Sequence, residues 1–265
     1  MKLNVLIPVA FLELGALALP GSLDTRAAPT IYTAGDSTMA AKGANNGLTD
    51  GWGQYLSKYV SVPVVNKAMG GRSARSYTHE GRFTAIANLV KAGDIVVIEF
   101  GHNDGGTPSS ASDNKRSDCP GTGETTCKSG LDGSTVYTFD HYVKAAAKTF
   151  IAKGAKVVFS SQTPNNLWEG GVYSVTAPRF VSYAAQAAKE VGVGASFVDH
   201  FQAVANMYKK LGSSATNALY PKDHTHTSPK GADLSAQAFA QAIKLALNGT
   251  TPLSPYLNAH NPTVW

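Results

Sequence analysis

Residues 31–39 decide the fold, and they read Ile31-Tyr32-Thr33-Ala34-Gly35-Asp36-Ser37-Thr38-Met39. A short apolar run that ends in a Gly-Asp-Ser turn is typical of a buried strand. Such a strand holds the serine hydroxyl and the serine N–H at a fixed place on the edge of a sheet, as acyl transfer requires. We therefore interpret Ser37 as a candidate nucleophile. An ordinary polar turn is the alternative, so the interpretation depends on partners elsewhere in the chain.

Strands and helices are expected to alternate along the whole chain. Apolar runs predict strands at 62–69, 94–100, 156–161 and 196–199, and helical spacing predicts helices at 51–60, 80–90, 139–152, 178–191, 201–211 and 229–247. The last of these helices has Ser228 as its expected N-cap and Pro229 at its first position. Alternation predicts an α/β fold, with a central parallel sheet and helices on both faces. In such sheets ligands bind beyond the carboxyl ends of the strands.

The chain of 265 residues, 43% of them hydrophobic, is long enough for one sizeable domain, which we place at 29–248, with a C-terminal tail at 249–265. Lys2, an apolar run to Leu19 and the small-x-small pattern of Ala16-Leu17-Ala18 predict a signal peptide at 1–18, with a short leader to 28. This run is too short for a stable membrane span. The sequence therefore predicts a secreted protein.

Charge and cysteine content add two weaker expectations. Removing residues 1–28 takes away two basic and two acidic residues, so the net charge stays at +5, which is mild support for a polyanionic substrate. In an oxidising compartment, Cys119 and Cys127 are expected to close a small surface loop. A zinc site would need two more ligands, and residues 109–134 contain neither histidine nor another cysteine.

The segment Asp223-His224-Thr225-His226 precedes the last helix. Asp223 is three residues ahead of His226, so its carboxylate can accept from Nδ1–H and leave Nε2 facing Ser37. His224 is the competing base. A metal site is the other alternative, but His-x-His lacks an evident third protein ligand.

Acyl transfer also needs donors for the developing oxyanion. The candidates are the N–H of Ser37, the N–H of Gly71 and the side-chain amide of Asn103, each of which follows a predicted strand. Taken singly, the Gly71 and Asn103 segments are more typical of ordinary turns.

Four segments together resemble the four blocks of the SGNH (GDSL-type) hydrolase superfamily: Gly35-Asp36-Ser37, Gly71, Gly101-x-Asn103-Asp104 and Asp223-x-x-His226. Within it, the longer motifs at 34–40, 71–77, 99–106, 160–166 and 223–229 resemble the fungal rhamnogalacturonan acetylesterases, carbohydrate esterases that remove acetyl groups from the rhamnogalacturonan backbone of pectin.

The resemblance implies a flavodoxin-like three-layer fold with Ser37 as nucleophile, His226 as base and Asp223 as its orienting carboxylate. It also implies an oxyanion hole formed by Ser37, Gly71 and Asn103, and a disulfide between Cys119 and Cys127. The expected protein is a secreted, monomeric serine esterase that works through an acetyl-serine, with no cofactor or metal and no nucleic-acid or membrane partner. The alternatives are the same chemistry on another acetylated polysaccharide such as xylan, and a non-catalytic carbohydrate-binding protein.

Substrate contacts are a separate expectation. Arg72 and Arg75 follow the Gly71 turn and are candidates to bind galacturonate carboxylates, although such arginines are often paired with nearby acids such as Glu80. Trp168 is a candidate to stack on sugars, with packing as its alternative. Asn248-Gly249-Thr250 is a candidate glycosylation site.

Overall fold

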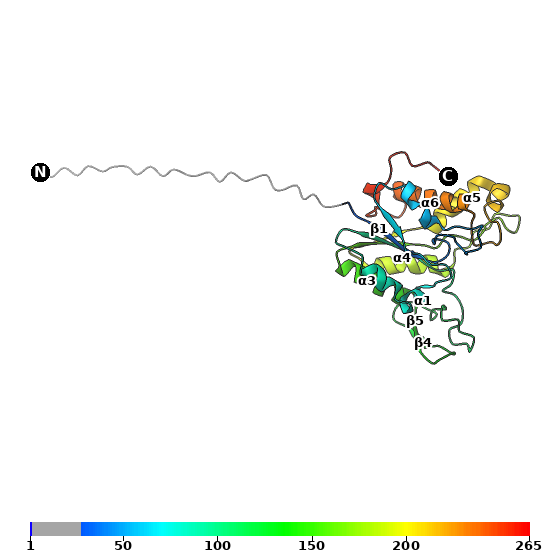
Figure 1. The fold of residues 1–265 in the computed structure, drawn as a ribbon, viewed down its shortest axis with the longest axis horizontal. Coiled ribbons are helices and arrows are strands. Elements are labelled where there is room, and N and C mark those ends of the chain that lie inside the picture. Colours follow the sequence, from blue (N-terminus) through cyan, green and yellow to red (C-terminus); the bar gives the residue numbers. More distant parts are fainter. Residues whose placement is uncertain (2–27) are drawn as a thin grey trace.

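Five parallel strands form the central sheet in the computed structural model, which describes Met1 and residues 28–265 (Figure 1). Their order across the sheet is β2 (Val64–Asn66), β1 (Ile31–Gly35), β3 (Ile95–Glu99), β6 (Lys156–Ser160) and β7 (Ala195–Val198). The predicted signal peptide lies outside the described residues apart from Met1, as does nearly all of the leader.

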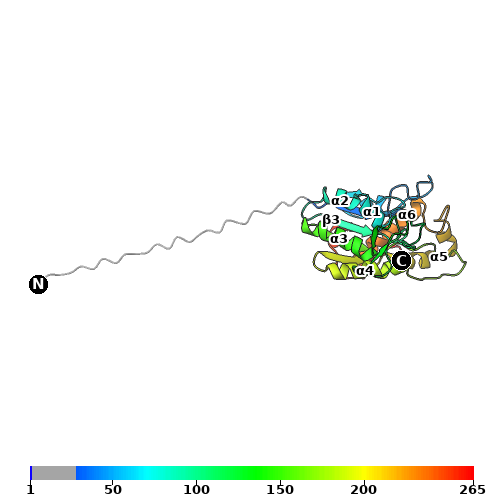
Figure 2. The same ribbon diagram turned by 90° about the horizontal axis from the view of Figure 1, so that it is seen from below.

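Helices cover both faces of the sheet. One face carries α1 (Ala74–His79), α2 (Arg82–Ala87), α3 (Phe139–Ala152) and α4 (Arg179–Val191). Figure 2, seen from the side of α3 and α4, shows α2, α3 and α4 lying next to one another. The opposite face carries α5 (His200–Asn217) and α6 (Pro229–Lys244), as Figure 1 shows.

Side chains alternate along each strand and so supply two separate cores. Ile31 and Ile95 pack in the cluster beneath α5 and α6. Tyr32 and Val96, each one residue further on, pack in the cluster beneath α1–α4. Strands buried on both faces explain why β1 and β3 are apolar runs, and the predicted three-layer α/β fold is confirmed.

The prediction of a helix at 51–60 is wrong. The chain forms two 3₁₀ turns there, Trp52–Gln54 and Leu56–Lys58. The amide of Trp52 donates to the Thr38 carbonyl at 2.9 Å, and a Cβ on Gly51 would lie only 2.3 Å from the Ala40 carbonyl oxygen. The segment is therefore packed onto the Ser37 turn, and bonds three residues apart, from the Tyr55 amide to the Trp52 carbonyl and from the Tyr59 amide to the Leu56 carbonyl, close 3₁₀ turns in place of a regular helix.

One helix and one two-stranded hairpin were not predicted. Helix α1 begins after Ser73, whose side chain accepts from the Ser76 amide in a capping box. A hairpin of β4 (Thr126–Lys128) and β5 (Thr135–Tyr137) lies between the predicted strand at 94–100 and the predicted helix at 139–152, where no element was expected. The disulfide between Cys119 and Cys127 is present, with the two Cα atoms 5.7 Å apart.

The other helices follow the sequence closely. Helix α3 has the predicted bounds, and Ser228 caps α6 by accepting from the Gly231 amide. Helix α5 continues past the predicted end at 211, but Gly212, with φ of 76°, interrupts its helical geometry.

The C-terminal tail packs against the domain. It contains a 3₁₀ turn at Ser254–Tyr256, and Leu253 is fully buried. The Asn261 side-chain amide donates to the Tyr59 carbonyl at 2.8 Å. In the part of the chain that the structure describes, no helix combines the length and the apolar character needed to cross a membrane.

Candidate active site

Ser37 lies at the carboxyl end of β1, where the chain turns sharply. The Asp36 carboxylate accepts from the Thr38 amide at 2.9 Å and from the Thr38 hydroxyl at 2.8 Å, so Asp36 holds the turn. Ser37 itself is 5% exposed. Burial raises the pKa of Asp36.

His226 reaches Ser37 from the loop before α6. Its Nε2 lies 2.8 Å from Ser37 Oγ, and its Nδ1 lies 2.9 Å from Asp223 Oδ2. Because the ionised carboxylate can only accept, Nδ1 carries the hydrogen in this contact, and Nε2 of the neutral ring presents its lone pair to the serine hydroxyl. Asp223, His226 and Ser37 thus form one continuous chain of hydrogen bonds.

Local geometry fixes the Asp223 carboxylate as well. Its Oδ1 accepts from the backbone amides of Thr225 at 2.8 Å and His226 at 2.7 Å. Burial raises the pKa of Asp223, but the hydrogen bonds from His226 and Thr225 outweigh it and hold the pKa below its usual value. Asp223 is therefore ionised over the range in which histidine titrates.

His224 does not contact Ser37. Its Nδ1 lies 3.3 Å from Glu169 Oε1 at the exposed surface. Among the described residues, no group of three or more His, Cys, Asp or Glu side chains is arranged to hold a metal ion. The two histidines of this loop thus point to different partners.

The three candidate oxyanion donors lie at one cavity. In the described part of the chain, the amides of Ser37 and Gly71 have no hydrogen-bond acceptor. Gly71 has φ of 75°, a conformation that favours glycine. Asn103 donates from Nδ2 to the Arg72 carbonyl at 3.0 Å. Since an amide NH₂ carries two hydrogens, the second N–H of Asn103 remains available to donate to a ligand.

The cavity has a volume of about 630 Å³. The described residues that line it include the cations Lys42, Arg72 and Arg116, and no carboxylate; the full set is Ser37, 41–45, 69–72, Asn103, Arg116 and His226. This lining matches a ligand that carries negative charge.

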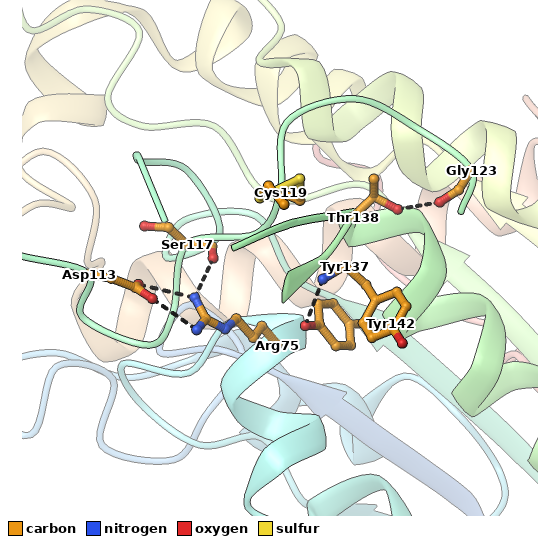
Figure 3. Close-up of a disulfide and its surroundings, with 9 residues drawn as sticks. Arg75, Asp113, Ser117, Cys119, Gly123, Tyr137, Thr138 and Tyr142 are labelled. Carbon is orange, nitrogen blue, oxygen red and sulfur yellow. Dashed lines mark hydrogen bonds and ion pairs between the residues drawn. A yellow bond between two sulfur atoms is a disulfide. The ribbon is translucent and has the colours of Figure 1, made fainter. Parts of the chain in front are cut away.

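The expectation that Arg75 meets substrate is wrong. Its side chain is 1% exposed, and its two Nη atoms bind Asp113 Oδ1 and Oδ2 at 3.0 and 2.9 Å (Figure 3). Nη1 also donates to the Ser117 carbonyl at 2.9 Å. Arg72, by contrast, lines the cavity while its Nε pairs with Glu80 at 3.0 Å.

Trp168 does not line the cavity either. Its indole N–H donates to the Tyr208 carbonyl at 2.8 Å, and its ring packs against Tyr173 with centroids 5.1 Å apart. The packing alternative holds for this residue. Asn248 is exposed, and its Oδ1 accepts from the Asp199 amide at 2.9 Å.

Sequence reasoning missed Arg116, which lines the cavity. Its Nη1 lies 3.3 Å from the Gly71 carbonyl oxygen and 3.3 Å from Asn103 Oδ1. The surrounding polar loop, 107–118, carries no motif, and its one signal is a basic residue close to the first cysteine.

Comparison with known proteins identifies the family of this chain. The family model described as GDSL-like lipase/acylhydrolase matches residues 31–239. A rhamnogalacturonan acetylesterase from Emericella nidulans is 51% identical over 230 residues, which cover 86% of this chain and 90% of that protein. A rhamnogalacturonan acetylesterase from Bacillus subtilis is 29% identical over 232 residues, covering 81% of this chain and 89% of that protein.

Solved structures share the fold. The YxiM protein of Bacillus subtilis superposes with a TM-score of 0.64 at 24% identity, covering 83% of this chain and 57% of that chain. An acetylxylan esterase from Geobacillus stearothermophilus gives a TM-score of 0.54 at 17% identity, covering 81% and 93%. With the family match extending from β1 into α6, the chain belongs to the GDSL-like lipase/acylhydrolase family.

Proposed function

We propose that this protein is a rhamnogalacturonan acetylesterase, a serine esterase that removes acetyl groups from the rhamnogalacturonan backbone of pectin. The observation that carries the proposal is the chain of hydrogen bonds from Asp223 through His226 to Ser37 beside a cavity lined by cations. The 51% identity to the Emericella nidulans enzyme supports the same substrate.

The proposed reaction has two halves. Ser37 Oγ attacks the acetyl carbonyl while His226 Nε2 takes the hydroxyl proton, and the N–H groups of Ser37, Gly71 and Asn103 donate to the oxyanion. His226 then gives the proton to the departing sugar oxygen, which leaves an acetyl-serine. In the second half His226 activates a water that attacks this ester, and acetate and free Ser37 result.

The charge of the cavity supports pectin over a neutral polysaccharide. Rhamnogalacturonan carries galacturonate carboxylates, whereas the lining of the cavity supplies Lys42, Arg72 and Arg116. Arg72 is the proposed substrate contact, since its side chain borders the cavity while Nε pairs with Glu80 and Nη1 donates to the Gly70 carbonyl at 3.0 Å.

Acetate release from four esters tests the proposal: acetylated rhamnogalacturonan, acetylated xylan, acetylated homogalacturonan and a small aryl acetate. We expect the highest kcat/KM on rhamnogalacturonan. A higher kcat/KM on acetylated xylan would change the proposed substrate to xylan and leave the proposed serine esterase mechanism unchanged. A protein that releases acetate from none of them would contradict the esterase assignment and leave the carbohydrate-binding alternative to be tested by binding to the same polymers.

A role outside the cell is part of the proposal. The disulfide between Cys119 and Cys127 is typical of proteins from oxidising compartments, and the predicted signal peptide at 1–18 provides the export route. Mass spectrometry of the N-terminus of the protein recovered from culture medium tests this part. A chain in the medium that still starts at Met1 would contradict the predicted signal peptide, and a chain that stays in the cells would contradict the role outside the cell.

A further inference from the structure

Arg116 contacts two of the three segments that supply the proposed oxyanion donors. A single nitrogen, Nη1, lies 3.3 Å from the Gly71 carbonyl oxygen and 3.3 Å from Asn103 Oδ1. Nη1 carries two hydrogens, so it can donate one to each oxygen. The guanidinium therefore links the Gly71 turn to the Asn103 loop.

This contact determines how the Asn103 amide is oriented. Arginine has donors and no acceptor, so the amide must turn its oxygen toward Arg116 and its nitrogen away. The nitrogen then donates one hydrogen to the Arg72 carbonyl at 3.0 Å. With both ends of the amide held, its remaining N–H has a fixed direction at the edge of the cavity beside Ser37.

Arg116 forms no ion pair with any residue that the structure describes. In the described part of the chain no carboxylate lies within 4.0 Å of its guanidinium, whereas its neighbour Lys115 pairs with Asp132 at 3.3 Å. The charge of Arg116 thus acts on the two carbonyl oxygens. A cation bound to Oδ1 draws electron density from the Asn103 amide, which makes its N–H a stronger donor.

A buried framework places Arg116 at the cavity. Arg75 donates to the Asp113 carboxylate and to the Ser117 carbonyl, on either side of Arg116 (Figure 3). The Ser117 hydroxyl donates to the Gly105 carbonyl at 3.1 Å, which ties the same turn to the Asn103 loop. Between Asp113 and Ser117, Lys115 has φ of 61°, an uncommon conformation that persists where the surrounding structure holds it.

We propose that Arg116 is a positioning residue of the oxyanion hole, which orients and polarises the Asn103 amide toward the tetrahedral intermediate. The inference rests on the proposed function, because it assigns Asn103 to the oxyanion. Arg116 takes no part in proton transfer and acts through Asn103. This role does not depend on the charge of the polysaccharide.

A double-mutant cycle on a neutral aryl acetate tests the inference. We expect Arg116→Ala to lower kcat on the order of 10- to 100-fold with little change in KM, since a small misplacement of a catalytic group has costs of this size. Asn103→Ala should lower kcat on the order of 100- to 1000-fold. In the Asn103→Ala background, adding Arg116→Ala should change kcat by less than about twofold, because residues that act through one another are not additive.

Lys115→Ala is the matched control, since it removes a cation from the same turn. The Lys115 side chain pairs with Asp132 and does not line the cavity. This control should keep wild-type kcat, and all variants should keep the wild-type Tm within a few degrees. Additive losses in the cycle would overturn the inference. So would an Arg116→Ala variant with normal kcat on the aryl acetate and a raised KM on the polymer alone, which would make Arg116 a substrate contact.

The experiments distinguish failure of the proposed substrate from failure of the proposed role of Arg116. If the wild type hydrolyses the aryl acetate but not rhamnogalacturonan, the substrate assignment fails and the cycle still measures the role of Arg116. A wild type that hydrolyses no ester overturns both.

Discussion

The hydroxyl oxygen of Ser37 lies 2.8 Å from Nε2 of His226, although 189 residues separate them in the chain. The parallel sheet brings them together, because β1 ends in the Ser37 turn and the loop before α6 returns to the same edge. The contact unites a nucleophile with a base whose other nitrogen is already engaged by Asp223.

Replacing Ser37 by alanine should remove esterase activity and leave the fold intact. The expected loss of kcat is on the order of a million-fold, the size seen when a serine nucleophile is removed. Acetate release measures it, and the circular dichroism spectrum reports the fold. Ser182→Ala is the control, because this exposed hydroxyl donates only to its own helix at the Arg179 carbonyl, 2.8 Å away. Activity close to wild type in Ser37→Ala would end the assignment.

Asp223→Asn should lower kcat by about 10⁴-fold with little change in structure. An amide at this position can donate to Nδ1 of His226, which favours the tautomer whose Nε2 carries the hydrogen and cannot accept from Ser37. Glu169→Gln tests whether any carboxylate in this region matters, since Glu169 pairs with His224 instead. Equal losses in the two variants would contradict the specific role of Asp223.

The sequence predicted the sheet and the Ser37, Asn103 and His226 segments because each depends on local signals. Buried parallel strands are apolar runs, and their carboxyl ends share one edge whatever the details of packing. The Ser228 cap could be predicted for the same reason, since a serine before Pro229 is a local feature.

Arg75 could not be predicted because its partner is distant in sequence. Asp113 lies 38 residues away, in a loop without periodicity, and nothing near Arg75 indicates that the side chain is buried. The same loop carries Arg116. The wrong role for Arg75 and the omission of Arg116 therefore have one cause, the lack of any local signal in this loop. Contacts distant in sequence also escaped prediction at 51–60, where the amides of Trp52 and Gly53 donate to the carbonyls of Thr38 and Met39 in the Ser37 turn.

The burial of Arg75 predicts its effect on stability. Removing one member of a buried ion pair leaves the other charge uncompensated, so Arg75→Ala should lower the free energy of unfolding by about 3–5 kcal/mol. Arg72→Ala is the contrast, because its pair with Glu80 is exposed and worth at most about 1 kcal/mol. Urea unfolding measures both. Similar losses in the two variants would refute the distinction.

Two buried acids, Asp104 and Asp118, should make the stability of the protein depend on pH. Asp104 is 0% exposed and Asp118 is 3% exposed, and the Asp118 amide donates to the Asp104 carbonyl at 2.9 Å. Burial raises the pKa of Asp104 to about 7. Burial and the charge of Asp104 raise the pKa of Asp118 well above its usual value. The folded state therefore keeps protons that the unfolded chain releases above about pH 4.

Because the folded state binds more protons in this window, the contribution of the pair to the free energy of unfolding is fully present below about pH 4 and falls as pH rises to about 7 and beyond. Asp118→Asn should make this fall shallower, since its amide can donate to the Asp104 carboxylate without titrating. Urea unfolding at several values between about pH 4.5 and 7.5 measures the slope. Asp132→Asn is the control, because hydrogen bonds from Ser134 hold the pKa of that exposed carboxyl below its usual value, so it titrates below this window. If the free energy of unfolding falls equally steeply with pH in wild type and Asp118→Asn, the Asp104 and Asp118 pair does not govern stability in this range.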